Sequence, residues 1–239
     1  RADGGGGSTL FLPIPYAKGC KITFEVPEKF SKQPRYYQIN YRKYEIKTRV
    51  ETFSQEVVLR AQKKIDEVSN LLLQPAVSYP GKNLLKSKGK IKTQDSILLN
   101  LPNGGNAVYE IRFSITLSNM ADFAQVMREL VFTAEFDGKQ TVWVPIGDFS
   151  GGGMGAPYVN SWYLSSDGKG NIISRWLMPY KKNAIIGLRN FSSSEVDVSI
   201  ETQVGPLKWT DRSLYFHASW RQEAGLLLSH CNEDIDKPT

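Results

Sequence analysis

Two segments of the chain carry the residue types that could bind or transform a ligand. The first is WVPIGDFSGGGMG, residues 143–155, in which Asp148 follows a predicted strand and precedes a run of glycines. Glycines let a backbone approach a ligand closely. The segment lacks the Lys-Ser/Thr pair of a phosphate-binding loop, and no helix pattern follows it, so nucleotide binding is disfavoured. Two interpretations stay open: a ligand-binding loop, or a turn in which Asp148 accepts hydrogen bonds from nearby backbone N–H groups.

The second segment is YFHASWRQE, residues 215–223, which is predicted to be a strand with two unlike faces. Alternation places one set on one face, His217, Ser219, Arg221 and Glu223, and the other set on the opposite face, Phe216, Ala218, Trp220 and Gln222. Polar groups beside a large ring suit sugar binding, because the apolar face of a sugar stacks on Trp while its hydroxyls form hydrogen bonds. The alternative is a half-buried strand whose Arg221 and Glu223 form an ordinary ion pair.

The candidate substrate-binding residues are Asp148, His217, Trp220, Arg221 and Glu223. No catalytic residue is assigned, because neither histidine lies beside a recognisable Ser or Cys nucleophile. The two cysteines, Cys20 and Cys231, do not have metal-ligand spacing. We therefore expect neither a metal nor a cofactor.

Composition excludes several function classes. With 41% hydrophobic and 23% charged residues, the 239-residue chain has the composition of an ordinary globular protein. Its apolar runs fall far short of the ~20 residues that cross a bilayer, so we expect no membrane span. The net charge is +6, and the densest basic stretch is Lys82–Lys92. We interpret residues 80–93 as a solvated basic loop, and expect no nucleic-acid partner, because the stretch lacks interleaved aromatic residues.

The elements that would position these residues are mostly strands. Alternating patterns predict strands over residues 20–25, with Cys20, Ile22 and Phe24 facing a core, and over 36–42, together forming a hairpin. Further strands are predicted over 109–117 and 196–200, and a short helix over 122–129. Between this helix and the strand over 196–200, the sequence predicts a hairpin with a solvent-facing Asp137-Gly138 turn. Many strands and few helices indicate an all-β sandwich, of which the jelly roll is one arrangement.

One long surface helix is expected over residues 52–73. A capping box of Thr52 and Gln55 would begin it, and Pro75 would end it. Its single apolar stripe is typical of packing, and we assign it no chemistry.

A short motif occurs twice, at Pro15-Tyr16 and at Pro179-Tyr180, each followed by an alternating segment. The repeat favours two related β-domains, and we expect parts of two tandem jelly rolls. Residues 1–101, with the helix and the basic loop, would belong to the first. Residues 102–239 would belong to the second, incomplete at its C-terminal end.

An ordered set of motifs resembles a known family. FLPIPYAKGCKITFE with YYQINYR is followed by VWVPIGDFSGGGMG, LMPYKKNAIIGLRN and YFHASWRQE. In this order they are similar to glycoside hydrolase family 172, formerly domain-of-unknown-function family 2961. The departures are small: Ser150 stands where the family often has a second Phe, and Tyr180 where it usually has Phe.

The resemblance implies a tandem jelly-roll protein, exported to the periplasm or cell surface and assembled as trimers or multiples of trimers. It implies cleavage or transfer of furanosides, such as α-fructofuranosides or arabinofuranosides, by a retaining mechanism. Two glutamates would act as nucleophile and acid/base with carboxyl groups about 5–5.5 Å apart. In the family they lie in Glu-Gly-Asp-Glu and Thr-Glu-Asp-Tyr motifs, and neither occurs in this sequence. We therefore interpret the chain as a segment whose catalytic motifs lie outside it. The alternative is a non-catalytic jelly roll that binds glycans or serves as an assembly subunit.

Overall fold

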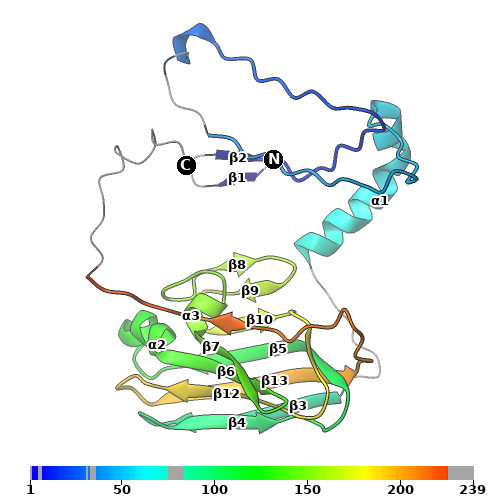
Figure 1. Cartoon of the computed structure of the whole chain (residues 1–239). Helices are drawn as coiled ribbons and strands as arrows, with labels where there is room; N and C mark the ends of the chain where they lie inside the picture. The colour runs from blue at the N-terminus through cyan, green and yellow to red at the C-terminus, as the bar shows by residue number, and fades with distance from the viewer. Residues whose placement is uncertain (1, 5–6, 31, 33–35, 75–82, 226–239) are drawn as a thin grey trace. The chain divides into compact units, whose positions relative to one another are not determined.

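The computed structural model describes residues 2–4, 7–30, 32, 36–74 and 83–225 (Figure 1). Contacts between residues divide the chain into two units, Arg1–Ser69 and Asn70–Thr239. The second unit contains most of the regular structure and nearly all of the buried core.

Eight strands of the second unit form a jelly roll. One sheet, called here the β5 sheet, has the order β3 (Asn83–Ile91), β13 (Val196–Pro206), β5 (Asn106–Thr116), β10 (Asn171–Ser174). The facing β6 sheet has the order β4 (Ser96–Asn100), β12 (Ala184–Asn190), β6 (Leu130–Phe136), β7 (Lys139–Pro145). Numbered along the chain, these strands lie in the orders 1-8-3-6 and 2-7-4-5, which is jelly-roll topology. The predicted all-β jelly-roll sandwich is confirmed, and its strands lie on both sides of residue 101.

Short strands extend both sheets. Strands β9 (Leu164–Ser166) and β8 (Val159–Asn160) continue the β5 sheet beyond β10, and β11 (Met178–Tyr180) also pairs with β5. Strand β14 (Ala218–Ser219) joins the β6 sheet in parallel beside β7. It thereby brings the segment around residue 220 onto the sandwich.

Alternation builds the core between the sheets. Strand β5 turns Ile111, Phe113 and Ile115 inward while Arg112 and Ser114 face solvent. The Phe113 ring meets Phe132 of β6 edge-on, with centroids 5.1 Å apart. Each such fully buried side chain contributes about 1.5–3 kcal/mol. The predicted short helix is confirmed as η2 (Met120–Asp122) and α2 (Phe123–Glu129), which lies with α3 (Ile146–Phe149) at one end of the sandwich (Figure 1).

Residues 83–91 were expected within a basic loop, and that prediction is wrong. They form strand β3, which pairs with β13 along its whole length. Lys86, Lys88 and Lys90 are exposed, whereas the residues between them are half-buried and Ile91 is fully buried. The Gly and Ser between the lysines resembled a loop in composition, but they alternate with period two, as a half-buried strand requires.

The hairpin of β6 and β7 turns at Asp137-Gly138 as predicted. Asp137 and Gly138 have φ values of 53° and 79°, the conformation of a type I′ turn. The tip is not simply solvent-facing, because Asp137 is half-buried. Its carboxylate accepts hydrogen bonds from the backbone N–H groups of residues 181–183 and from the Tyr215 hydroxyl. Asp137 thus ties the hairpin to the turn before β12.

The first unit contains β1 (Ala2–Gly4), β2 (Gly7–Thr9) and η1 (Glu28–Phe30). The long helix is confirmed as α1 (Gln55–Leu73), with no fully buried residue. Its start differs from the predicted capping box: the Ser54 hydroxyl accepts the Val57 N–H at 3.3 Å. Thr52 instead accepts the Ala17 N–H at 3.2 Å. No helix among the described residues is long and apolar enough to cross a membrane.

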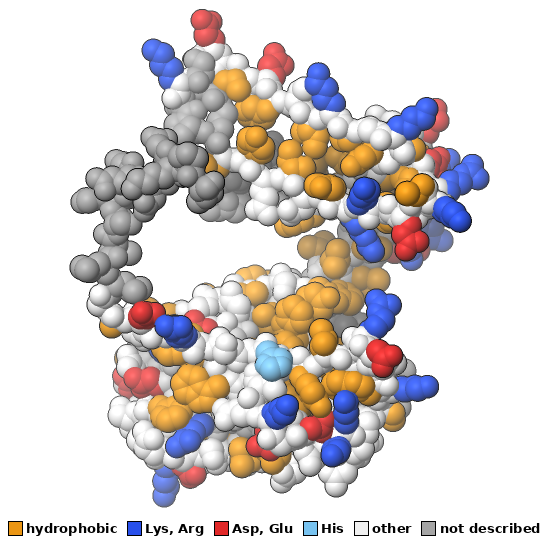
Figure 2. Space-filling model, viewed as in Figure 1, with side chains coloured by type: hydrophobic (Ala, Val, Ile, Leu, Met, Phe, Trp, Pro, Cys, Tyr) orange, Lys and Arg blue, Asp and Glu red, His pale blue; other side chains and the backbone are white. Residues whose placement is uncertain are grey.

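The predicted strands over residues 20–25 and 36–42 are wrong. Their described residues form no strand, and their apolar side chains are exposed, with Phe24 at 77% and Tyr37 at 87%. Figure 2 shows many hydrophobic side chains at the surface of the described chain. An alternating pattern becomes a strand only where a neighbouring strand completes its hydrogen bonds and a second layer covers its apolar face. Neither is found for these two segments among the described residues.

The two copies of the repeated motif lie in unlike settings. Pro179-Tyr180 belongs to β11, where Tyr180 is fully buried and donates its hydroxyl to the Pro102 carbonyl at 2.8 Å. Pro15-Tyr16 lies outside any strand, and Tyr16 is exposed. Only the second copy precedes a sheet strand, so the parallel between the copies is limited to sequence.

Candidate functional site

Asp148 lies on α3, where it meets Arg128 at the end of α2. One guanidinium nitrogen of Arg128, Nη1, donates to both carboxylate oxygens at 3.0 and 2.9 Å. The two helices come this close because residue 147 is glycine. A Cβ there would lie 2.8 Å from the Gly153 carbonyl oxygen and 3.0 Å from that of Met127, which is too near for any larger residue. The backbone around Gly147 therefore sets the position of Asp148.

Arg128 also covers Trp220. Its guanidinium carbon lies 4.7 Å from the centroid of the Trp220 ring, within cation–π range. The pairing of β14 with β7 positions Trp220. The backbone N–H of Trp220 also donates to the backbone carbonyl of Trp143 at 3.2 Å. The rings of Trp143 and Trp220 lie 6.4 Å apart. We call Arg128, Trp143, Asp148 and Trp220 the Arg128 cluster.

The Arg128 cluster is accessible from solvent. The side chains of Arg128 and Asp148 are 37% and 27% exposed, and Trp143 is 37% exposed. A paired carboxylate and guanidinium offer several acceptors and donors in a fixed arrangement, and the indole beside them offers an apolar plane. This combination can hold a hydroxyl-rich ligand with an apolar face.

The glycine-rich loop after α3 supports the site through its backbone. Gly151, Gly153 and Gly155 have φ values from 77° to 82°, which side-chain-bearing residues rarely adopt. The Asp148 carboxylate pairs with Arg128 rather than with nearby backbone N–H groups, so the alternative that made it a turn-capping group is wrong in this detail. The glycines allow the backbone to turn. The carboxylate of Asp148, just before them, stays partly exposed to solvent beside Arg128.

The remaining predicted residues lie around β14 but outside the cluster. The strand expected over 215–223 is reduced to Ala218–Ser219, although its alternation is correct, since Phe216, Ala218 and Trp220 pack against the core. His217 is exposed. Arg221 donates to Glu223 at 2.8 Å, with both side chains well exposed, as an ordinary surface ion pair would be. The structure thus joins Asp148 and Trp220 but not the other three.

Arg128 was not among the candidates from the sequence. It lies within the predicted short helix, with no local pattern that distinguishes it from a solvated charge. Its partners are 20 and 92 residues further along the chain, and only the fold brings them to it. Among the described residues, no group of three or more His, Cys, Asp or Glu is arranged to hold a metal ion.

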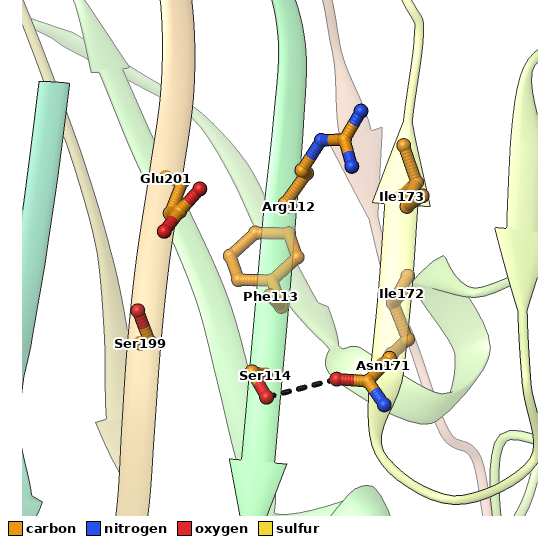
Figure 3. A pocket seen from close by; sticks show the side chains of 8 residues that line it. All are labelled: Arg112, Phe113, Ser114, Asn171, Ile172, Ile173, Ser199 and Glu201. Atoms are coloured by element: carbon orange, nitrogen blue, oxygen red, sulfur yellow. Dashed lines mark hydrogen bonds between the residues drawn. The ribbon is translucent and has the colours of Figure 1, made fainter. Parts of the chain in front are cut away.

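Apart from the Arg128 cluster, a hollow lies on the outer face of the β5 sheet. It has a volume of about 280 Å³ and is lined by side chains of β5, β10 and β13 (Figure 3). The polar members of its lining are Arg112, Ser114, Asn171, Ser199 and Glu201. This hollow belongs to the opposite sheet from the one that carries Trp143 and β14.

Comparisons with known proteins locate the chain in one family. The GH172 first beta-sandwich domain matches residues 1–61, and the GH172 domain-like region matches residues 81–203, which contain nearly all of the jelly roll. No curated protein matches the chain. One similar solved structure is PliG of Aeromonas hydrophila, a periplasmic inhibitor of g-type lysozyme. It has 16% identity and a TM-score of 0.27 over 54% of this chain and 93% of that one. Because the family models match more than half of its residues, the chain belongs to glycoside hydrolase family 172.

Proposed function

We propose that this chain is a segment of an enzyme that cleaves or transfers furanosides of the α-fructofuranoside or arabinofuranoside type. Within it, the Arg128 cluster contributes to the sugar-binding surface. Family membership supports a glycoside hydrolase as the parent protein. The choice of furanosides rests on the resemblance of the ordered motifs.

The observation that carries the proposal is the contact of Asp148 and Trp220 through Arg128. These residues come from two motifs far apart in sequence, and the fold joins them at the surface. Asp148 and Arg128 can bond to neighbouring hydroxyls of one sugar ring. Arg128 already covers one face of Trp220, so the more exposed Trp143 ring is the plane on which the sugar would stack.

Catalysis is proposed to reside in two glutamates that this sequence does not contain. The motifs Glu-Gly-Asp-Glu and Thr-Glu-Asp-Tyr are absent. A retaining reaction needs both a nucleophile and an acid/base. The 239-residue chain should therefore bind furanosides without hydrolysing them. A non-catalytic glycan-binding role is the second candidate, favoured by the same absence, and would be preferred if the parent protein also fails to cleave aryl furanosides.

The test is a tryptophan-fluorescence titration of the 239-residue chain with methyl fructofuranoside, methyl arabinofuranoside and methyl glucopyranoside. We expect saturable changes with a furanoside and a weaker response to the pyranoside. Asp148→Asn should weaken binding about tenfold, because hydrogen bonds to a charged group contribute about 1.5–3 kcal/mol. Glu223→Gln is the matched control and should bind as the unmodified chain does.

Two results would refute this placement. One is unchanged binding in Asp148→Asn, with melting showing that the fold is intact. The other is hydrolysis of an aryl furanoside by this chain that is abolished by Glu223→Gln, which would place catalysis within these residues.

Assembly as trimers or multiples of trimers, in the periplasm or outside the cell, is part of the same proposal. Large apolar side chains in the first unit support assembly, since Phe11, Tyr36 and Tyr37 are 87–93% exposed. Exposed apolar surface of this kind is typical of protein interfaces. Light scattering of the purified parent protein measures the assembly, and fractionation of cells that express it measures the location.

A further inference from the structure

The outer face of the β5 sheet presents two rows of side chains across its strands. Register places Lys86, Glu201, Arg112 and Ile173 in one row, and Lys88, Ser199, Ser114 and Asn171 in the next. The middle of the second row consists of two serines, the shortest side chains in either row. A groove therefore forms where long side chains flank short ones.

Figure 3 shows this arrangement. Ser199 and Ser114 lie side by side on adjacent strands, with Glu201 and Arg112 one row away and Asn171 on β10. A volume of about 280 Å³ lies just below the range of about 300–1,000 Å³ that is usual for small-ligand sites. The groove is open along the sheet, so it suits a section of an extended chain better than an enclosed small molecule.

The polar groups of the groove are held in place before any ligand arrives. Lys86 Nζ lies 2.7 Å from Glu201 Oε1, and Arg112 Nε donates to Glu110 Oε1 at 2.6 Å. The Glu110 side chain is only 4% exposed. Ser114 Oγ donates to Asn171 Oδ1 at 2.8 Å. These contacts favour one arrangement of the polar groups, which would reduce the conformational entropy lost when a ligand binds.

The charges on this face favour an uncharged ligand. Lys90 lies 3.3 Å from Glu195 and 3.9 Å from Asp197, just as Lys86 lies beside Glu201. Arg112 is paired with Glu110. Of the cations in the two rows, only Lys88 has no carboxylate partner among the described residues. A polyanion would meet the carboxylates of this face and gain little from the cations that they neutralise. Hydroxyl groups, in contrast, can donate to the carboxylates and accept from the guanidinium at no cost in net charge.

An aromatic pair borders the same sheet at the β9 side. The rings of Tyr163 and Trp176 are nearly parallel, with an interplanar angle of 7° and centroids 4.1 Å apart. Tyr163 is 46% exposed, and its carbonyl accepts the N–H of Arg175, two residues after Ile173. The pair is not part of the groove's lining, since Trp176 packs against the core with its ring 6.1 Å from that of Phe216. The groups that would bind a sugar are therefore the hydroxyl, amide and carboxylate groups of the groove itself.

We propose that this groove is a second carbohydrate site, which binds a section of a neutral polysaccharide chain. It would hold the parent enzyme on polymeric substrate while the reaction takes place elsewhere. The site does not depend on the Arg128 cluster, since the two lie on opposite sheets of the sandwich.

The experiment is affinity electrophoresis of the 239-residue chain in gels that contain inulin, arabinan or heparin. The key variant is Ser114→Phe, which fills the groove, and its matched control is Thr116→Phe, two residues further along β5 on the same outward face. Phenylalanine is well tolerated at outward strand positions, so both variants should fold. Thermal melting verifies this.

We expect retention by a neutral polysaccharide, weakened about tenfold by Ser114→Phe and unchanged by Thr116→Phe. Glu201→Gln, which keeps the shape but removes the charge, should weaken retention in the same direction. Repeating the Ser114→Phe and Thr116→Phe variants in an Asp148→Asn background separates the two proposals. A loss of retention caused by Ser114→Phe in that background belongs to the groove, whether or not the Arg128 cluster binds sugar.

Four results would overturn the proposal. They are equal losses in Ser114→Phe and Thr116→Phe, no loss in a folded Ser114→Phe variant, no retention by either neutral polymer, and retention by heparin alone that disappears with salt.

Discussion

Replacing Asp137 by asparagine should destabilise the jelly roll while leaving its hairpin turn intact. Asparagine tolerates positive φ, and Asn-Gly suits a type I′ turn as well as Asp-Gly does. The change therefore tests the carboxylate alone. In the native protein that carboxylate accepts the N–H groups of residues 181–183 at 2.8, 2.6 and 3.0 Å and the Tyr215 hydroxyl at 2.8 Å.

The magnitude follows from which of these bonds an amide can keep. The oxygen of asparagine can still accept from Lys182 and Asn183, which share one carboxylate oxygen. Its NH₂ group would face the N–H of Lys181, and two donors repel each other. Tyr215 can rotate its hydroxyl to accept instead. The net loss is one charge-assisted bond and a weakening of two more, so unfolding should cost about 2 kcal/mol less.

The effect should depend on pH. Burial of the Asp137 carboxyl by itself would raise its pKa, but the hydrogen bonds from the backbone of residues 181–183 and from Tyr215 outweigh burial and hold the pKa below 3.8. A group with a lowered folded-state pKa stabilises the protein above its unfolded pKa and loses that effect as pH falls through the folded pKa. The difference between native and variant should therefore be full at pH 7 and shrink below about pH 4.

Urea denaturation at pH 7 and at pH 3 measures this difference. Asp211→Asn is the control, because Asp211 is exposed in a turn and its replacement should change stability by less than about 0.5 kcal/mol. If Asp137→Asn is as stable as the native protein at pH 7, or if its deficit is the same at both pH values, the carboxylate does not stabilise the fold in this way.

Three further changes test the packing at single positions, each by urea or thermal melting. Tyr180→Phe removes the buried hydroxyl that donates to the Pro102 carbonyl and should cost about 1–3 kcal/mol, whereas an effect near zero would mean that water replaces this bond. Gly187→Ala places a Cβ 2.5 Å from the Leu98 side chain and 2.6 Å from the Ile97 carbonyl oxygen, and should destabilise the β4–β12 pairing by about 1–3 kcal/mol. Unchanged stability would mean that the β4 backbone shifts at little cost. Ser54→Ala removes the cap of α1 and should cost about 1 kcal/mol of helix stability, measured by loss of helical circular dichroism at intermediate urea.

Local patterns predicted the strands that lie between two layers. Strand β5 was recognised because its inward residues must be apolar and its outward residues must not be, which fixes a period of two. The β6–β7 hairpin was recognised because only a few residue pairs adopt positive φ at a two-residue turn. In both cases the physical requirement acts on neighbouring residues, so the sequence displays it directly.

The wrong predictions concern segments whose structure depends on pairing with residues far away in the sequence. Strand β3 was interpreted as a loop because its inward side chains include Ser87 and Gly89, which pass for loop residues unless the pairing with β13 is known. The segment over 20–25 shows the opposite error, because its pattern is regular but no neighbouring strand pairs with it among the described residues. An alternation of apolar and polar residues is typical of a half-buried strand, but it does not show whether another strand is present to pair with it.

The same reasoning explains why half of the candidate site could be predicted. Asp148 and Trp220 stood out because an acidic residue before glycines and a tryptophan among polar residues are unusual locally. Arg128 did not, although it holds the other two together. A solvated arginine and a bridging arginine look alike in sequence, since the difference lies in the parallel pairing of β14 with β7.

Jelly-roll topology also explains how the two proposed ligand surfaces can be separate within one domain. Its two sheets share a core that uses the inward side chains of every strand, so the outward side chains do not have to fill that core. On the β6 sheet the parallel addition of β14 extends the sheet beside β7 and brings Trp220 to Arg128. On the β5 sheet two serines on neighbouring strands, Ser114 and Ser199, leave a groove on the outer face. Changes on one face can therefore alter ligand binding there without disturbing the core on which the other depends.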